Sequence, residues 1–488
     1  MATSTPVLMI IFFFAFVPLV LAEVARKRAV PTIENFFLQD RKMPLVMVFF
    51  TVYSTWVSSF AFLGGSSYFY SMGPVYLTAF AWNVLFGIMF MVIGKRIWYY
   101  GKAQSYITPT DFFNDIYASP ILNLFITSIM LVFTLPYLQI QLLGGAYIIE
   151  IASNGMIPYK ISGLLFYLII IIYLWAGGLR AVALADIFYG ILIFISMLTM
   201  GFFFIAKAGG IDYVFETIHE IGRVNLTITS DFNNSGILLW LSMFAVIPVG
   251  AIMGPQLWIR AYAVERKTTF HIMPFLITFA TIMYLGSILS GSAGILLLPG
   301  VEETDTIIPK MLLLYGSEIL AALCFCGIAA AALSTANSQI HAVAAIYTID
   351  IHKRYIQKNA SENRLVAIGK WVVLFISATA YFLMLQYPGL IIETGVLAMG
   401  GTAQVIVPTL GALFWNKSNY RAAILGLSIG ILCLTILKTA FDLNASLCGI
   451  IALIINGVLF IVGSIWLKPN AETRFKITQY KRDYDQNN

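Results

Sequence analysis

The chain has 488 residues, of which 60% are hydrophobic, 15% aromatic and only 11% charged. Soluble proteins carry about a quarter charged residues, so this composition excludes a soluble globular protein. The formal net charge of +6 needs no nucleic-acid partner, because basic residues collect on the cytoplasmic side of membrane proteins. We therefore predict an all-α polytopic membrane protein that lies in a lipid bilayer.

About thirteen apolar runs are long enough to cross roughly 30 Å of hydrocarbon. They lie near residues 6–23, 43–65, 74–94, 121–149, 159–176, 182–206, 236–258, 270–297, 313–346, 365–386, 389–415, 420–440 and 447–467. The first run has no basic N-terminal region and is followed by Arg26, Lys27 and Arg28. We therefore interpret it as a retained helix rather than a signal peptide.

The basic residues predict the orientation of the chain. With the N-terminus outside, most loop Lys and Arg residues fall on one side, including Arg260 and Arg266 after the seventh span and the tail from Lys468. This side is the cytoplasmic one, and the C-terminus lies there too. We expect a multi-pass protein of the plasma membrane.

Two spans contain residues that interrupt helices. The second carries "VYSTWVSSFAFLGG" (Val52 to Gly65), with four Ser and Thr hydroxyls and two glycines. An unwound turn there would free backbone carbonyls near Ser54 and Val57. The seventh carries "VIPVGAIMGPQLW" (Val246 to Trp258), whose prolines and glycines predict a broken helix.

The two interrupted spans divide the chain into comparable halves. Spans two to six (about 43–206) and seven to eleven (about 236–415) each open with an interrupted helix. Because five is odd, the second group enters the membrane upside down relative to the first. The predicted organisation is an extra N-terminal helix in 1–33, a core in 34–415, two further spanning helices in 416–467 and a cytoplasmic tail in 468–488.

The ninth span contains "AALSTANSQI", a polar stretch within an apolar run. Ala331, Ser334 and Thr335 have i, i+3, i+4 spacing and share one helix face. Hydroxyls beside a reachable carbonyl are suitable ligands for a hard monovalent cation. Spacing alone leaves the alternative open, namely that these hydroxyls bond back to the preceding turn and permit close packing.

Each of the other polar residues within the spans allows two interpretations, one structural and one functional. Asp186, at the start of the sixth span, is either a helix N-terminal acid or part of an ion path. Gln141 and Gln404 either reach a solute or form interhelical hydrogen bonds. The four histidines have no ligand spacing, and no nucleotide motif or catalytic set is visible, so we predict neither an enzyme nor an ATP-driven pump.

Five segments, in this order, resemble motifs of the sodium:solute symporter family. They are "ENFFLQDRKMP", "SSFAFLGGSSYFYSMG", "LQIQLLGGAYII", "AGGLRAVALADIFYGILIF" and "IAAAALSTANSQIHAVAAIYTIDIHKRY". The resemblance runs from about Glu34 to Trp415. It is closer to pantothenate, monocarboxylate and proline carriers than to sugar carriers.

The resemblance implies a LeuT-type fold with thirteen spans and two inverted five-helix repeats. It also implies Na⁺ ligands, which by alignment are Ser54, Val57, Ala331, Ser334 and Thr335. Some members hold a second sodium, for which the matching positions are Asp186, Ser334, Asn337 and Ser338. Here Asn337 replaces a hydroxyl with an amide. The residues that bind sugar in other members match Trp56, Phe60 and Ala61, which argues against a sugar.

Our leading hypothesis is a sodium-coupled secondary active symporter that imports a small organic solute by alternating access. Trp56, Ser59, Phe60 and Gln141, with Gln404, are the candidate solute residues. This aromatic, weakly polar set suits a monocarboxylate, an amino acid or a pantothenate-like acid, without an intramembrane Arg or Lys as counter-charge. The alternatives are a proton-coupled carrier of the same fold and a sensor or channel-like protein that does not transport. We expect a monomer.

Overall fold

The computed structural model describes residues 32–222, 236–386, 389–467 and 470–487, with isolated residues in 10–27 and 224–228 and the backbone alone over 173–177. Half of the first predicted span, 6–23, lies outside the described residues. In the described part the regular elements are helices, and one isolated β-bridge joins Met43 to Val264. The all-helical prediction is confirmed.

Helices occupy every predicted span from the second to the thirteenth. They are α3 (Leu45–Trp56) with α4 (Gly65–Met72), α5 (Thr78–Met89), α8 (Pro120–Ala152), α9 (Tyr159–Lys207), α11 (Ile237–Ile252) with α12 (Pro255–Ala263), α13 (Thr268–Ala280) with α14 (Tyr284–Leu297), α16 (Glu318–Ile346), α17 (Glu362–Gln386), α18 (Ile391–Ala403) with α19 (Ile406–Phe414), α20 (Tyr420–Thr439) and α21 (Ala445–Trp466). Within the described residues, nine helical stretches are long and apolar enough to cross a membrane, or ten with the bent pair α11–α12.

Helix α9 contains both the fifth and the sixth predicted spans. It is divided at Gly178, whose φ of 57° and ψ of −160° are not helical. A Cβ at this position would lie 2.9 Å from the backbone oxygen of Phe36. Both the left-handed backbone and the close approach require glycine here.

One predicted boundary differs from the structure. The ninth span does not begin at residue 313, because α15 (Ile307–Tyr315) is a separate helix. Gly316 is extended, and the Ser317 hydroxyl accepts a hydrogen bond from the Leu320 amide, which starts α16. The segment 95–120, between the third and fourth predicted spans, contains α6 (Lys95–Gln104) and α7 (Pro109–Tyr117).

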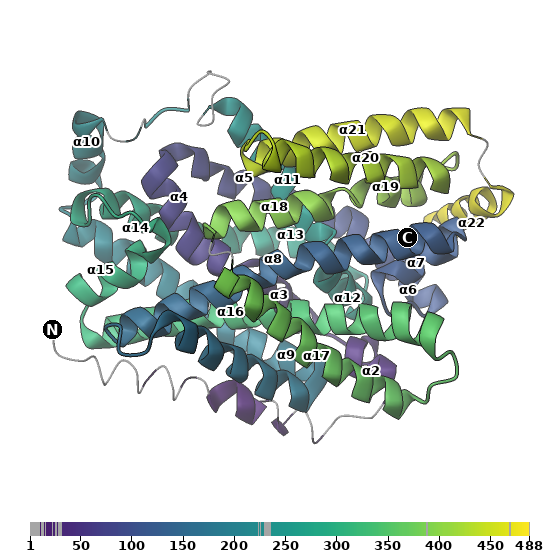
Figure 1. Cartoon of the computed structure of the whole chain (residues 1–488), viewed down its shortest axis with the longest axis horizontal. Coiled ribbons are helices and arrows are strands. Elements are labelled where there is room, and N and C mark those ends of the chain that lie inside the picture. Colours follow the sequence, from purple (N-terminus) through teal and green to yellow (C-terminus); the bar gives the residue numbers. More distant parts are fainter. Residues whose placement is uncertain are drawn as a thin grey trace.

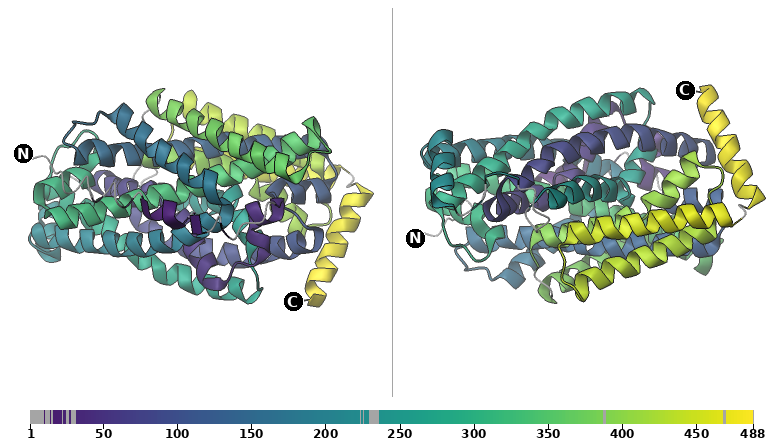
Figure 2. Two further views of the ribbon diagram at one scale, coloured as in Figure 1. Left: turned by 90° about the horizontal axis from the view of Figure 1, so that it is seen from below. Right: turned by 90° about the horizontal axis from the view of Figure 1, so that it is seen from above.

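The helices run along the long axis of the molecule, and short helices cover its two ends. Figure 1 shows α10 (Ile211–Ile221) and α15 at one end and α6, α7 and α22 (Ala471–Asn487) at the other. Helix α22 lies across that end, while α20 and α21 run along the side of the bundle (Figure 2). Helix α16 is enclosed by other helices, because 83% of its apolar 18-residue stretch is buried, against 28% of the corresponding stretch of α17. Polar side chains on α16 therefore face protein rather than lipid.

Candidate ion and solute site

The first interrupted helix is broken between α3 and α4, as predicted. Helix α3 ends at Trp56, and Val57 is extended with φ −84° and ψ 103°. The Ser59 amide donates to Gln141 Oε1 of α8 at 3.1 Å, and the Phe60 amide donates to Ser58 Oγ at 3.1 Å. Side chains thus satisfy the backbone groups that the break releases.

The second interrupted helix is also broken, as predicted. Helices α11 and α12 meet at an angle of 55°. Pro255 begins α12 and Pro248 lies inside α11. Gly250 packs directly against α18, since a Cβ there would lie 2.2 Å from the Met399 carbonyl oxygen. The break therefore lies deep in the helical bundle.

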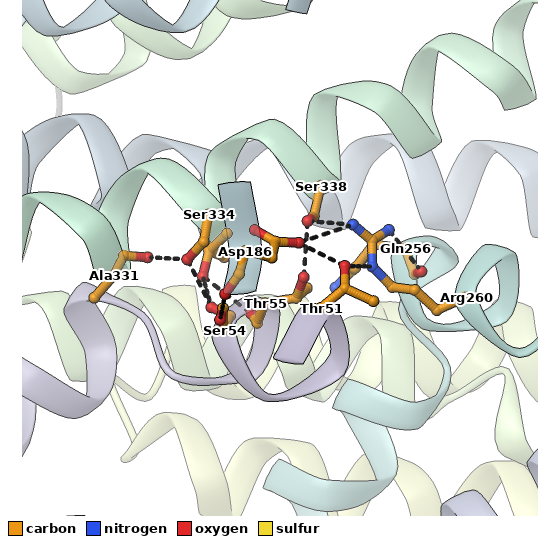
Figure 3. A network of polar contacts seen from close by, with 10 residues as sticks. Thr51, Ser54, Thr55, Asp186, Gln256, Arg260, Ala331, Ser334 and Ser338 are labelled. Carbon is orange, nitrogen blue, oxygen red and sulfur yellow. Dashed lines mark hydrogen bonds and ion pairs between the residues drawn. The ribbon is translucent and has the colours of Figure 1, made fainter. Parts of the chain in front are cut away.

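A cluster of uncharged oxygens joins α16 to the end of α3. Ser334 Oγ donates to the Ser54 carbonyl at 2.7 Å and to the Ala331 carbonyl at 3.2 Å. Thr335 Oγ1 donates to the Thr55 carbonyl at 3.0 Å and lies 3.4 Å from the Ser54 carbonyl. All five residues are buried. We call this set the hydroxyl cluster (Figure 3).

The hydroxyl cluster consists of backbone carbonyls and Ser and Thr hydroxyls. Such hard, neutral oxygens at an unwound helix suit a monovalent cation such as Na⁺. Of the residues predicted for this ion, the structure brings together Ser54, Ala331, Ser334 and Thr335. Val57 lies at the break itself, where its extended backbone turns its carbonyl out of the helical direction.

One turn further along α16 lies a charged cluster, which we call the Asp–Arg pair. Asp186 and Arg260 are both completely buried, with Oδ2 and Nη2 4.0 Å apart. Thr51 Oγ1 donates to Asp186 Oδ2 at 2.5 Å and accepts from Arg260 Nε at 3.2 Å. Arg260 also donates to Ser338 Oγ and, at 3.2 Å, to the Gln256 carbonyl. Figure 3 shows the carboxylate and the guanidinium facing each other beside Ser338.

The Asp–Arg pair corrects two predictions. Arg260 is not a cytoplasmic loop residue, because α12 continues to Ala263 and buries it, so the core does contain a basic residue. Asp186 is not in the first turn of the sixth span either, since that span begins at Gly178, eight residues earlier. Asn337, also predicted near this position, is buried, and its Oδ1 has no hydrogen-bond partner among the described residues.

Sequence reasoning missed Thr51 and Arg260. Thr51, Ser54 and Thr55 have the same i, i+3, i+4 spacing as Ala331, Ser334 and Thr335. That repeat was a usable signal for a polar face on α3. For Arg260, the signal was its place five residues after Pro255, only two residues beyond the end of a span already predicted to be broken.

A narrow cavity of about 30 Å³ lies beside the two breaks. Its wall includes Thr55, Trp56, Tyr137, Gln256 and Gln339, with residues of α18. The Trp56 indole stacks on Phe86 at 4.6 Å and donates to Asn83 Oδ1. These contacts fix the orientation of the indole at the cavity wall.

The other predicted solute residues do not line this cavity. Ser59 and Gln141 hold the first break, and Phe60 packs 6.4 Å from the Tyr137 ring. The prediction that Gln404 binds the solute was wrong. Gln404 lies at the interface with α21, where Asn456 Nδ2 donates to its Oε1 at 3.1 Å. It therefore forms the interhelical contact that was the alternative interpretation.

Comparisons with known proteins agree with this architecture. The profile of the Sodium:solute symporter family matches residues 36–430. The sodium/pantothenate symporter of Haemophilus influenzae is 24% identical over 433 residues, 87% of this chain and 88% of that protein. The osmoregulated proline transporter OpuE of Bacillus subtilis is 26% identical over 353 residues, 70% of each chain.

Solved structures show the same fold. A Na⁺-coupled sialic acid symporter in a substrate-bound outward-open state has a TM-score of 0.82 at 16% identity, covering 95% of this chain and 98% of that one. The nucleobase-cation-symport-1 family transporter Mhp1, in a closed conformation, has a TM-score of 0.58 at 12% identity, covering 91% and 97%. The predicted LeuT-type fold is confirmed. The chain belongs to the sodium:solute symporter family and is a sodium-coupled solute symporter.

Proposed function

We propose that this symporter binds Na⁺ at the hydroxyl cluster and imports a small carboxylate-bearing solute through the cavity at the breaks. The ligands are the carbonyls of Ser54, Val57 and Ala331 and the hydroxyls of Ser334 and Thr335. The observation that carries the proposal is the 2.7 Å contact between Ser334 Oγ and the Ser54 carbonyl. It brings the oxygens of two distant helices to one point.

Thr55 connects the ion to the solute. Its carbonyl accepts from Thr335 Oγ1 at 3.0 Å, and the same residue forms part of the cavity wall. An ion that pulls α3 against α16 therefore also positions one wall of the cavity. Coupling of this kind is typically worth about 1 to 3 kcal/mol, and each ligand raises the affinity for the other by the same factor.

The driving force comes from the ion. Each inward positive charge contributes roughly 2.3 kcal/mol at a potential of 100 mV, before the sodium gradient is counted. Alternating access requires that both ligands leave on the cytoplasmic side. Neutral oxygen ligands support this step, because no fixed charge retains the sodium ion.

Two features support a solute with a carboxylate. Helix α12 begins at Pro255, and Gly254 and Gln256 line the cavity, so the positive end of the α12 dipole lies at the cavity wall. The names of the relatives give pantothenate and proline as solutes, and both carry a carboxylate. Trp56 and Tyr137 provide apolar surface for the rest of the molecule.

Uptake into proteoliposomes tests this function. Purified protein would be given labelled pantothenate, proline or lactate, with glucose as a neutral control, under an inward sodium or potassium gradient. We expect one of the acids to accumulate with sodium and glucose not to accumulate. Equal uptake under both gradients, with accumulation driven by a pH gradient instead, would favour the proton-coupled alternative.

We also propose that the protein lies in the plasma membrane with its N-terminus outside and its C-terminus in the cytoplasm. The end that carries α6, α7 and α22 then faces the cytoplasm (Figure 1). Lys95, Arg96, Lys353, Arg354 and Lys476 support this orientation through the positive-inside rule. One chain contributes every residue of both sites, so we propose a functional monomer. Labelling of a single cysteine placed at Lys481 tests the orientation. A reagent that does not cross the membrane should label this cysteine in opened cells but not in intact cells.

A further inference from the structure

The Asp–Arg pair has the chemistry of a cation site. A carboxylate oxygen of Asp186 lies among the hydroxyls of Thr51, Ser338 and Thr55, with the last two 2.7 Å apart. Carboxylate and hydroxyl oxygens are the ligands that hard cations take from proteins. The site lies one helical turn from the hydroxyl cluster, because Ser338 follows Ser334 by four residues on α16.

A guanidinium already lies among these ligands. Arg260 Nη2 donates to Ser338 Oγ and lies 4.0 Å from Asp186 Oδ2, and Nε donates to Thr51 Oγ1 at 3.2 Å. Its side chain is completely buried and reaches α3, α9 and α16 at once. Arginine stays protonated in proteins, so this positive charge is permanent.

We infer that Arg260 is a built-in cation that takes the place of a second sodium, so that this chain binds one Na⁺ per transport cycle. The inference rests on the proposed sodium site at the hydroxyl cluster. Asp186 and Arg260 together are neutral. A sodium ion added beside them would meet a fixed positive charge in a buried, poorly screened environment, where repulsion offsets the attraction of the carboxylate.

The pair also supports the hydroxyl cluster without binding the ion. Ser54 Oγ donates to the backbone carbonyl of Asp186 at 2.8 Å, and the Ser54 carbonyl faces Ser334. Arg260 thereby helps to hold α3, α9, α12 and α16 around the cluster. It acts as a positioning residue that sets the number of ions.

The test counts bound sodium on the purified full-length protein. Binding of ²²Na⁺ in sodium-free choline buffer would be measured by equilibrium dialysis, normalised to protein that elutes as a single folded species. We expect one Na⁺ per wild-type chain and a Hill coefficient of one. Arg260→Gln removes the fixed charge and leaves the carboxylate, so it should bind two. Arg260→Lys keeps the charge and should bind one.

The outcomes separate this inference from the proposed function. Two sodium ions on the wild-type chain, or one on a folded Arg260→Gln variant, would overturn the role of Arg260. No sodium on folded wild-type protein, or full binding by Ser334→Ala, would instead overturn the proposed sodium site. If Arg260→Gln does not fold, Asp186→Asn decides. Compared with wild type, it binds the same number of sodium ions if Arg260 fills the second position, and one fewer if Asp186 is an ion ligand.

Discussion

The hydroxyl cluster and the Asp–Arg pair share helix α16 but treat charge in opposite ways. At Ser334 and Thr335, all partners are neutral carbonyls. At Ser338, a carboxylate and a guanidinium compensate each other. A transported ion must leave, so neutral ligands that bind it moderately suit that task. A fixed pair completes its own charge balance and serves to hold helices in place.

Breaking the fixed pair should have the largest effect. Asp186→Leu leaves the buried Arg260 charge without its carboxylate, which costs about 3 to 5 kcal/mol of stability. The double variant Asp186→Leu/Arg260→Met removes both charges and should recover most of that loss. Unfolding in mixed micelles with increasing dodecyl sulfate, followed by tryptophan fluorescence, measures both. Equal losses in the single and double variants would mean that the pair is not electrostatically coupled.

Removing one oxygen from the hydroxyl cluster should have a smaller and more specific effect. Ser334→Ala leaves the ion with one ligand fewer, a penalty of about 1 to 3 kcal/mol, or roughly five- to 150-fold in the sodium concentration for half-maximal uptake. Thr335→Ser keeps the hydroxyl and should change it little. If Ser334 only permits close packing, Ser334→Ala will leave the sodium dependence unchanged, because alanine also permits it.

The hydroxyl cluster and the breaks could be predicted because their signals are local. Proline and glycine interrupt a helix wherever it lies, and Ser334 and Thr335 share a face through spacing alone. The Asp–Arg pair could not be predicted in this way. Its carboxylate and guanidinium lie far apart in sequence, and rules based on loop charge assign an arginine near a span end to the cytoplasm. Gln404 was misplaced for a related reason, since its spacing does not reveal that α21 packs against it.

Loss of support at the first break should have an intermediate effect on stability. Gln141 Oε1 accepts from the Ser59 amide at 3.1 Å, and its Nε2 donates to the Tyr137 carbonyl at 3.0 Å. Gln141→Leu leaves the buried amide without an acceptor, at a cost of about 1 to 2 kcal/mol. Gln141→Glu keeps the acceptor and serves as the matched variant. Unfolding in mixed micelles compares the two, and an equally small loss in both would show that this acceptor does not hold the break.

Asp115 forms a charged pair of the same kind outside the membrane. This α7 carboxylate accepts from Lys476 Nζ at 2.9 Å and from the Tyr480 hydroxyl at 2.5 Å, both on α22. The Asp115 and Lys476 side chains keep 24% and 26% of their surface exposed. Solvent screens a partly exposed pair, so its contribution is about 1 kcal/mol or less. We therefore expect Asp115→Asn to loosen α22 without changing sodium-driven uptake.

The pH dependence of this contact follows from the direction of the pKa shift. Burial alone would raise the pKa of Asp115, but hydrogen bonds from Tyr106, Tyr480 and Lys476 and the Lys476 charge outweigh it and lower the pKa below its ordinary 3.8. A lowered pKa means that the contact is fully present above pH 3.8 and is lost as the pH falls through the folded-state value. Hydrogen exchange of α22 should therefore be equally protected by this contact at pH 5 and pH 8, once corrected for intrinsic rates. Asp115→Asn should reduce protection by the same factor at both values, and Lys481→Gln, an exposed change on the same helix, should not. Protection that changes between pH 5 and pH 8 in the wild type but not in Asp115→Asn would show that the carboxylate titrates in that range and that its partners do not stabilise its charge.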